Sequence, residues 1–385
     1  MMRHQNRIKF HTNKVIGKAM RESQSWVSGS SKYSSEQIFK TIVLSGLRKT
    51  SIEDQCLLQQ EQAGGYGSSP SADVVMETLD RSYGKMQLGA IETKISTNLQ
   101  KMAKILPQFK RKRTSVILAV DLHDEEYYGK HLLDPKGREI TMFGQLKNRS
   151  GNVSGNKRKV FRYATAAIVS FGKKLQIPIT IAFAVNYKGQ TRDDILSNIC
   201  NQILPLNLKI EFMVLDGGFA STRCFRFLNS LKIPFLSRGK LYKKKTYPIS
   251  DLNFVHVLRG NDGPYNVNAY IIEQRSPVGG IHRMMYLSSD KTTPKLLVRF
   301  YGKRFRIENT YRHARVSKIR TSTRKVHLRW MLFAISLLLE LVWEIIRYIG
   351  MAIGARNYCF RQKLIHVYFQ NFLEEQLIPA KKRFE

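Results

Sequence analysis

Two apolar runs, each ending on an aspartate, constrain the fold of this chain more than any other feature. SVILAV (115–120) is followed by Asp121, and EFMVL (211–215) is followed by Asp216. Short apolar runs of this kind are typical of strands buried on both faces of a sheet. If the two strands are neighbours, their carboxylates lie at the carboxyl edge of one sheet, where open α/β proteins bind ligands. Aspartate is also a common turn former at strand ends, so the pair alone leaves a structural role equally open.

The elements around these strands follow a definite order. Apolar stretches at 160–172 and 178–185, separated by a short turn, predict a hairpin. Helical periodicity follows at 191–204 and 221–232, and a short strand is expected at 233–237. The order strand–strand–strand–helix–strand–helix–strand is similar to that of the ribonuclease-H-like fold, an α/β class with a mixed sheet flanked by helices.

Two other parts of the chain, residues 1–110 and 240–297, show a pattern different from that of this α/β order. SSEQIFKTIVLSGLRK has a capping-box start, TSIEDQCLLQQEQ opens with a second cap, and together they predict two helices joined by a short turn. This pair is compatible with a helix-turn-helix DNA reader and also with a small helical bundle. We therefore expect four parts: a helical N-terminal region with a DNA-binding role (1–110), an α/β domain (111–239 and 298–350), a β-rich insertion (240–297) and a C-terminal tail (351–385).

A single acid stands in a strongly basic stretch near the end of the α/β domain. YGKRFRIENTYRHARVSKIR (301–320) places Glu308 among seven lysines and arginines. Five residues have helical spacing and would share one face of a continuous helix: Tyr301, Arg304, Glu308, Arg312 and Arg315. One interpretation is intrahelical pairing of Glu308 with an arginine, which contributes roughly 0.2–0.5 kcal/mol. The other is that Glu308 binds a metal ion on a helix whose cations hold DNA phosphates.

These motifs resemble those of the DDE transposases of bacterial and archaeal insertion sequences. One group carries Tyr-x2-Arg-x3-Glu-x6-Lys around its third acid, and Tyr301, Arg304 and Glu308 fit this spacing. Arg315 stands where the motif has lysine, which keeps the charge but changes the donor geometry. AVDLHD and VLDGGFAS resemble the motifs around the first and second acids, and a β-rich insertion before the third acid is expected of the group. The resemblance covers about residues 110–345.

The resemblance implies both the chemistry and the residues that carry it. Asp121, Asp216 and Glu308 would be the catalytic acids and would hold two Mg²⁺ ions, for which Mn²⁺ can substitute. Three further acids, 124–126, follow the first strand and are expected in a loop past its end. DNA contacts would come from five residues of the basic stretch: Tyr301, Arg304, Arg312, Arg315 and Lys318.

The charge of the chain agrees with a polyanionic partner. Lys and Arg number 64 against 29 Asp and Glu, a net charge of +35 at pH 7, and such a field attracts nucleic acid. A basic structural protein or a membrane-surface protein would share this charge. The apolar segment 330–350 carries four residues as one polar stripe, which favours an amphipathic core helix over a membrane span: Ser336, Glu340, Glu344 and Arg347.

The sequence also predicts the cellular compartment of the protein and its partners. Four scattered cysteines without a Cys-x-x-Cys pair indicate a reducing cytoplasm, and the basic N-terminus has no apolar run typical of a signal peptide. The resemblance implies a cytoplasmic, nucleoid-associated transposase that binds terminal inverted repeats of double-stranded DNA, nicks at transposon ends, resolves the second strand through a hairpin and joins 3′-hydroxyls to target DNA. Synapsis of two ends implies a homodimer. A catalytically inactive DNA-binding descendant and a structure-specific nuclease of the same fold are the alternatives.

Overall fold

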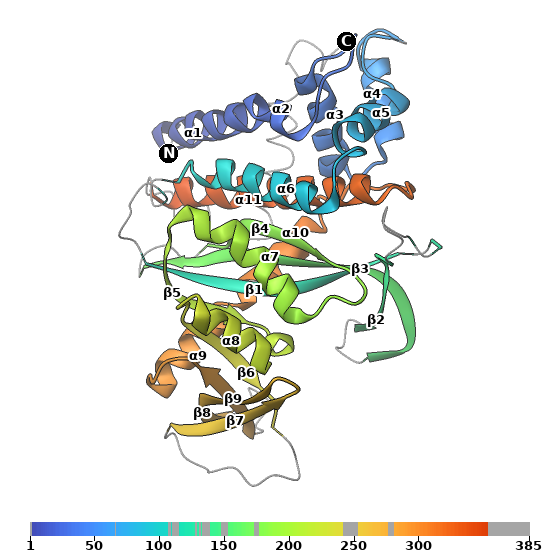
Figure 1. Ribbon diagram of the computed structural model, residues 1–385. Coiled ribbons are helices and arrows are strands. Elements are labelled where there is room, and N and C mark those ends of the chain that lie inside the picture. Colours follow the sequence, from blue (N-terminus) through green and yellow to red (C-terminus); the bar gives the residue numbers. More distant parts are fainter. Residues whose placement is uncertain are drawn as a thin grey trace. The chain divides into compact units, whose positions relative to one another are not determined.

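The computed structural model describes residues 2–65, 67–106, 109, 115–127, 129–130, 132, 139–147, 153–172, 177–241, 253–275 and 281–352. The chain divides into two compact units (Figure 1). We call Arg111–Asn309 the sheet unit. Met1–Lys110 and Thr310–Glu385 together form the helical unit, which is therefore built from two separate segments of the chain.

The sheet unit is built on one nine-stranded mixed sheet in the order β2-β3-β1-β5-β6-β9-β8-β7, with β4 paired to β3 (Figure 1). The strands are β1 (Ser115–Glu126), β2 (Met142–Lys147), β3 (Val153–Phe171), β4 (Ile179–Asn186), β5 (Lys209–Leu215), β6 (Phe235–Gly239), β7 (Phe254–Gly260), β8 (Gly263–Arg275) and β9 (Ile281–Ser288). The helices that begin in this unit are α7 (Arg192–Ile203), α8 (Thr222–Ser230), α9 (Pro294–Gly302) and α10 (Phe305–Ala314).

Five of these strands make the ribonuclease-H-like arrangement, which confirms the expected fold. The spatial order is β4-β3-β1-β5-β6, in which β1, β3 and β4 pair antiparallel and β1, β5 and β6 pair parallel. The parallel strands need crossover connections, which α7 and α8 supply. Because β1 lies between β3 and β5 and is covered on both faces, its residues Val116–Val120 are at most 2% exposed.

The β-rich insertion before the third acid continues the main sheet. Strand β9 pairs antiparallel with β6, β8 pairs with β9, and β7 pairs with β8 at the edge. The expected insertion is therefore present as three strands, and it extends the same sheet beyond β6. On the edge strand β7, Val255 and Val257 are 61% and 47% exposed.

The helical unit packs the N-terminal helices around a long C-terminal helix. Its helices are α1 (Met2–Arg21), α2 (Ser23–Trp26), α3 (Ser35–Arg48), α4 (Ile52–Gln62), α5 (Ala72–Tyr83), α6 (Leu88–Ala103) and α11 (Val326–Ala352). Helix α11 contacts α1, α3, α5 and α6. Ile91, Ile95 and Leu99, one helical turn apart on α6, are fully buried. None of the helices in the described ranges is long and apolar enough to cross a membrane.

The compact units divide the chain differently from the expected parts. We expected 298–350 to complete the α/β domain, whereas residues from Thr310 onward cluster with the N-terminal helices. Helix α11 is internal even on its polar side, because Ser336, Glu340 and Glu344 of its polar stripe are at most 3% exposed. The tail expected at 351–385 lies outside the described residues from position 353 onward.

Candidate active site

Asp121 and Asp216 occupy matching positions at one edge of the sheet. Strands β1 and β5 run parallel, and their last register pair is Val120 with Leu215. The two aspartates are the next residue on each strand. Neighbouring parallel strands that end in register place the following side chains at the same edge, which brings these two carboxylates together.

Strand β1 continues past Asp121 on one side only. Its pairing with β3 extends from Val116 to Glu126, well beyond the point where β5 ends. The prediction that residues 124–126 lie in a loop is therefore wrong, because the long strand β3 supplies a partner for them. Asp124 accepts a hydrogen bond of 2.6 Å from Nη2 of Arg162 on β3. This ion pair gives Asp124 a structural role inside the sheet.

The basic stretch forms two helices instead of the single helix that the spacing predicted. Helix α9 ends at Gly302, residues Lys303 and Arg304 form a turn, and α10 begins at Phe305. Glycine is unfavourable inside helices, which weakens the chain here. Contacts to β3 then hold the turn: Nζ of Lys303 donates to Oγ of Ser170 at 3.0 Å, and Nη1 of Arg306 donates to the Val169 carbonyl at 2.7 Å.

This turn places the guanidinium of Arg304 among the three predicted acids. Its Nη1 lies 3.2 Å from Oδ2 of Asp121 and 3.8 Å from Oδ1 of Asp216. Its Nη2 donates to Oε1 of Glu308, in the first turn of α10, at 2.6 Å. The structure thus gathers acids from two strand ends and one helix around a single cation.

Burial differs sharply within this cluster. Asp121 is 6% exposed and Arg304 is 7% exposed, whereas the side chains of Asp216 and Glu308 are 42% and 39% exposed. Burial raises the pKa of the Asp121 carboxyl to about 7; the charge of Arg304 opposes this shift and the charge of Asp216 adds to it. The cluster therefore has a buried end that resists ionisation and an open end that reaches solvent.

The five predicted DNA contacts fall into two groups. Tyr301 is 4% exposed and packs edge-on against Tyr286 with ring centroids 5.3 Å apart. The Arg304 guanidinium lies 5.5 Å from the centre of the Tyr301 ring, so these two residues belong to the buried acid cluster. The other three are exposed in the helical unit: Arg312, Arg315 and Lys318.

Sequence reasoning missed the position of Arg304 at the centre of the acids and the anchoring roles of Lys303 and Arg306. Gly302 is the local signal for the turn. The contacts that hold the turn connect residues more than 130 positions apart. The sequence of the basic stretch alone therefore does not predict these contacts.

The ribonuclease-H-like sheet with three carboxylates gathered at one edge is the architecture described above, and comparison with known proteins identifies the family. The family model for the transposase DDE domain matches residues 116–339, and the chain belongs to this family. The family implies nuclease and strand-joining chemistry, and DDE transposases in general use divalent metal ions.

Comparisons with solved structures and with curated proteins add little to the family assignment. Among solved structures, the chain is similar to the cryo-EM structure of a piggyBac transposase synaptic complex with hairpin DNA, with 11% identity and a TM-score of 0.47. That similarity covers 90% of this chain and 73% of the other. No curated protein matches the chain.

Proposed function

We propose that this protein is the transposase of a prokaryotic insertion sequence, which binds terminal inverted repeats, cuts DNA at the transposon ends and joins the freed 3′-hydroxyls to target DNA. The observation that supports this most directly is the convergence of Asp121, Asp216 and Glu308 on one guanidinium, in a chain of the transposase DDE family. Convergence from three separate segments is what a cation site for phosphodiester chemistry requires.

The acid cluster fits divalent cations. All three donor groups are carboxylates, the hard oxygen ligands that Mg²⁺ and Mn²⁺ prefer. Three carboxylates outnumber the single Arg304 cation, so negative charge remains for a metal to balance. We assign Asp121, Asp216 and Glu308 as the ligands of two Mg²⁺ ions, which when bound would activate the attacking hydroxyl and stabilise the leaving oxygen.

The residues of the cluster prepare the site in two ways. Asp121 must release its proton to become a ligand, because its buried carboxyl has a pKa of about 7. Arg304 must withdraw from the space between the acids, since its Nη atoms contact all three. Until then Arg304 holds the carboxylates in place; once displaced from them, its guanidinium can bind a DNA phosphate in a bidentate manner.

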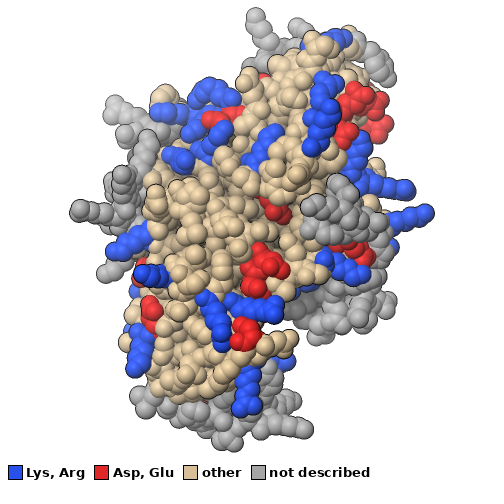
Figure 2. All heavy atoms as spheres, viewed as in Figure 1, with Lys and Arg blue, Asp and Glu red and all other residues tan. Residues whose placement is uncertain are grey.

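The distribution of charge favours DNA contact over a broad surface. Lys and Arg are spread over the face shown in Figure 2, with acidic side chains among them, and are not gathered in a single patch. Arg312, Arg315 and Lys318 continue the basic stretch after Glu308 and are exposed. Each phosphate that such residues neutralise releases counterions, so binding would depend steeply on salt.

Within the N-terminal region, charge favours α1 over the helix-turn-helix pair as the DNA contact. Helix α4, the second helix of the pair, carries Glu53, Asp54 and Glu61 and has no lysine or arginine. Helix α1 has the opposite composition, six Lys or Arg and no Asp or Glu. A helix in the major groove lies against phosphates, which disfavours an acidic helix there.

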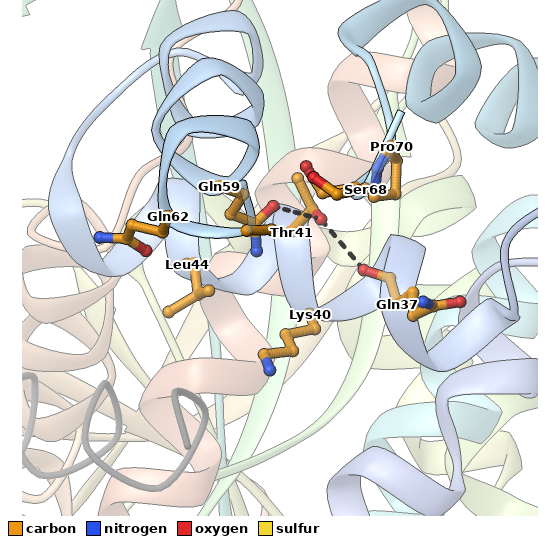
Figure 3. Close-up of a pocket in the computed structure, with 10 residues that line it drawn as sticks. Gln37, Lys40, Thr41, Leu44, Gln59, Gln62, Ser68 and Pro70 are labelled. Atoms are coloured by element: carbon orange, nitrogen blue, oxygen red, sulfur yellow. Dashed lines mark hydrogen bonds between the residues drawn. The ribbon is translucent and has the colours of Figure 1, made fainter. Parts of the chain in front are cut away.

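A hollow beside α3 and α4 supports this reading (Figure 3). Thr41 of α3 donates to the carbonyl of Gln37 at 3.0 Å and to Oε1 of Gln59 on α4 at 2.8 Å. The bond to Gln59 joins the two helices through uncharged groups, and Lys40 is the one cation among the described residues that line the hollow. Helices α3 and α4 thus have the features of helices that pack against each other to stabilise the N-terminal region.

We further propose that two chains pair to hold two DNA ends, and that the protein works at the nucleoid.

The test uses DNA from both sides of the protein's own gene. Full-length protein is incubated with Mg²⁺, a supercoiled plasmid and duplexes that end at the expected transposon boundary with a free 3′-hydroxyl. Joined products in the plasmid would support the proposal, and Glu308→Gln should abolish them. Cutting of branched DNA without joining would instead indicate a structure-specific nuclease. Specific binding with neither reaction would indicate an inactive descendant.

A further inference from the structure

We propose that His313, Glu340 and Glu344 form a second metal site in the helical unit, which takes a transition ion of the Zn²⁺ type and fixes the C-terminal end of α10 to α11. The site is separate from the three acids of the sheet unit. It does not rest on the proposed transposase activity, and its test needs no DNA.

The geometry brings three ligand atoms together. Glu340 and Glu344 are four residues apart on α11, so they lie on one face of the helix. His313 comes from the last turn of α10, and its Nδ1 lies 3.0 Å from Oε1 of Glu340. One ligand atom from each of the three residues lies within 4.8 Å of the others, a spacing that a single ion can bridge with small side-chain rotations.

Burial makes the two carboxylates of this cluster costly to keep charged. Glu340 is 3% exposed and Glu344 is 2% exposed. Two carboxylates held so close together and so far from water repel each other strongly. The Oε2 atom of Glu340 is buried and accepts no hydrogen bond from the residues that the structure describes. A buried carboxylate oxygen without a donor is unfavourable, and a metal ion is one group that would satisfy it.

The donor set indicates the class of metal. One imidazole nitrogen and two carboxylate oxygens are three ligands of the type that Zn²⁺ accepts, with a fourth position left for water. Magnesium avoids imidazole and keeps to oxygen, so the all-carboxylate cluster around Arg304 suits it better. The His313 side chain is 37% exposed, which gives an ion a route to the two buried glutamates.

An arrangement of two ion pairs is the competing explanation. His313 would pair with Glu340, and Nη1 of Arg347 already lies 3.0 Å from Oε1 of Glu344. This arrangement balances the charges but leaves Oε2 of Glu340 without a donor. The two explanations differ in one measurable respect, since only the metal site binds a divalent ion.

The experiment titrates Co²⁺, a spectroscopic substitute for Zn²⁺, into chelator-treated full-length protein and follows the visible d–d absorption. Wild type is compared with His313→Gln, Glu340→Gln and Asp121→Asn, the last as a matched control that alters the sheet-unit acids only. Whatever Co²⁺ binds at the sheet-unit acids, we expect one tight equivalent that is the same in wild type and in Asp121→Asn, and an affinity of this equivalent reduced by about 100-fold in the other two, since each loses one of three ligands. Zn²⁺ should displace the Co²⁺ and raise the unfolding temperature of wild type and of Asp121→Asn alone.

Three results would overturn the site: no tight Co²⁺ binding in wild type, binding that survives both His313→Gln and Glu340→Gln, or binding that Asp121→Asn removes. Circular dichroism and metal-free melting curves identify any variant that fails to fold. His313 is partly exposed, so His313→Gln carries the test if the buried Glu340→Gln does not fold.

Discussion

The sheet unit and the helical unit each hold three side chains that could bind a metal ion next to one arginine, and the position of that arginine distinguishes them. Arg304 contacts Asp121, Asp216 and Glu308 together. Arg347 forms an ion pair with Glu344, while Oε2 of the neighbouring glutamate has no hydrogen-bond donor among the described residues. The charges of the first cluster are thus partly balanced by Arg304, and the proposed metal ions would have to displace it. In the second, Oε2 of Glu340 is left as a possible ligand atom for the proposed ion, because no described residue donates to it.

The two clusters also differ in how far their acidic side chains are exposed to solvent. Asp216 and Glu308 retain about two fifths of their side-chain surface, whereas Glu340 and Glu344 are almost completely buried. A site that must reach the phosphate of a large substrate needs an open side. A site with two buried glutamates suits an ion that holds helices together.

The largest effect expected from this difference is on catalysis. Glu308→Gln keeps the shape of the side chain but removes the charge that a divalent ion needs. We expect DNA cleavage to fall by at least about 1,000-fold, because electrostatic stabilisation by the metal contributes several kcal/mol. DNA affinity should hold or rise, since a negative charge is lost. Cleavage is measured on labelled transposon-end duplexes and affinity by fluorescence anisotropy.

The matched control is Glu61→Gln on α4, which makes the same chemical change at an exposed site and should leave cleavage unaltered. If Glu308 only pairs with Arg304, its replacement costs a few tenths of a kcal/mol and cleavage continues. A Glu308→Gln protein that cuts DNA at near wild-type rate would contradict the catalytic role proposed for Glu308.

The second effect concerns stability without metal. Arg304→Met leaves three carboxylates near one another with no cation, and we expect it to lower the free energy of unfolding by about 2–3 kcal/mol. That is less than the roughly 3–5 kcal/mol for a fully buried pair, because two of the acids are partly exposed. Mg²⁺ should then stabilise the variant more than wild type, since no arginine competes for the acids. Melting curves with and without Mg²⁺ measure both.

Arg347→Met is the counterpart in the helical unit. It removes a contact to one acid and should cost less than Arg304→Met. Equal losses from the two variants, or a smaller Mg²⁺ effect in Arg304→Met than in wild type, would contradict a central role for Arg304.

The third effect is a pH dependence that arises at Asp121 in the sheet unit. Asp121 has a folded-state pKa of about 7, above its ordinary value of 3.8. Its contribution to metal-free stability is therefore greatest at acid pH, declines as pH rises from about 4 to 7, and is constant above that. Since the proton must leave before a metal binds, Mn²⁺ affinity should fall about tenfold per unit below pH 7.

Electron paramagnetic resonance of free Mn²⁺ between pH 5.5 and 8 measures this affinity. Asp121→Asn should bind Mn²⁺ weakly and should lack the steep dependence that begins near pH 7. A wild-type affinity that stays level from pH 5.5 to 8 would mean that Asp121 is already ionised throughout.

The smallest effect separates the exposed arginines from the buried one. Arg315→Ala should weaken DNA binding by about 3- to 10-fold and reduce the log–log salt slope by about 0.9, the value for one phosphate contact. Metal affinity at the sheet-unit acids should not change. Anisotropy titrations at several salt concentrations give the slope. An unchanged slope would mean that Arg315 does not touch the DNA backbone.

The sheet edge was predictable from sequence because its signals are local. The two apolar runs that end on Asp121 and Asp216 show directly which residues leave the sheet first, and the order of elements then makes their strands neighbours. The extension of β1 through residues 124–126 was not predictable, because it depends on the length of the distant strand β3, whose residues 160–162 pair with them. Polar residues at the end of an apolar run look the same in a loop and in a strand that has one partner.

Helical spacing singled out Glu308 in the sequence, but it did not predict the turn that precedes this residue. Helical spacing continues unbroken from Tyr301 to Arg315, so periodicity cannot reveal the turn at Lys303 and Arg304. That turn is held by the distant residues Ser170 and Val169. The stripe on α11 was visible in sequence as polar residues at helical intervals, but only the packing shows that it is buried and that His313 lies beside it.

The two-segment helical unit has a consequence for how the chain is made. Ile91, Ile95 and Leu99 of α6 leave the ribosome long before α11, against which their helix packs. The intervening sheet unit, Arg111–Asn309, takes on the order of 10–40 s to synthesise at about 5–20 residues per second. During that interval the sheet unit can fold by itself while the N-terminal helices hold an apolar face open to water. A nascent chain halted just short of α11 would therefore be a target for chaperones and proteases, whereas one released after it would not.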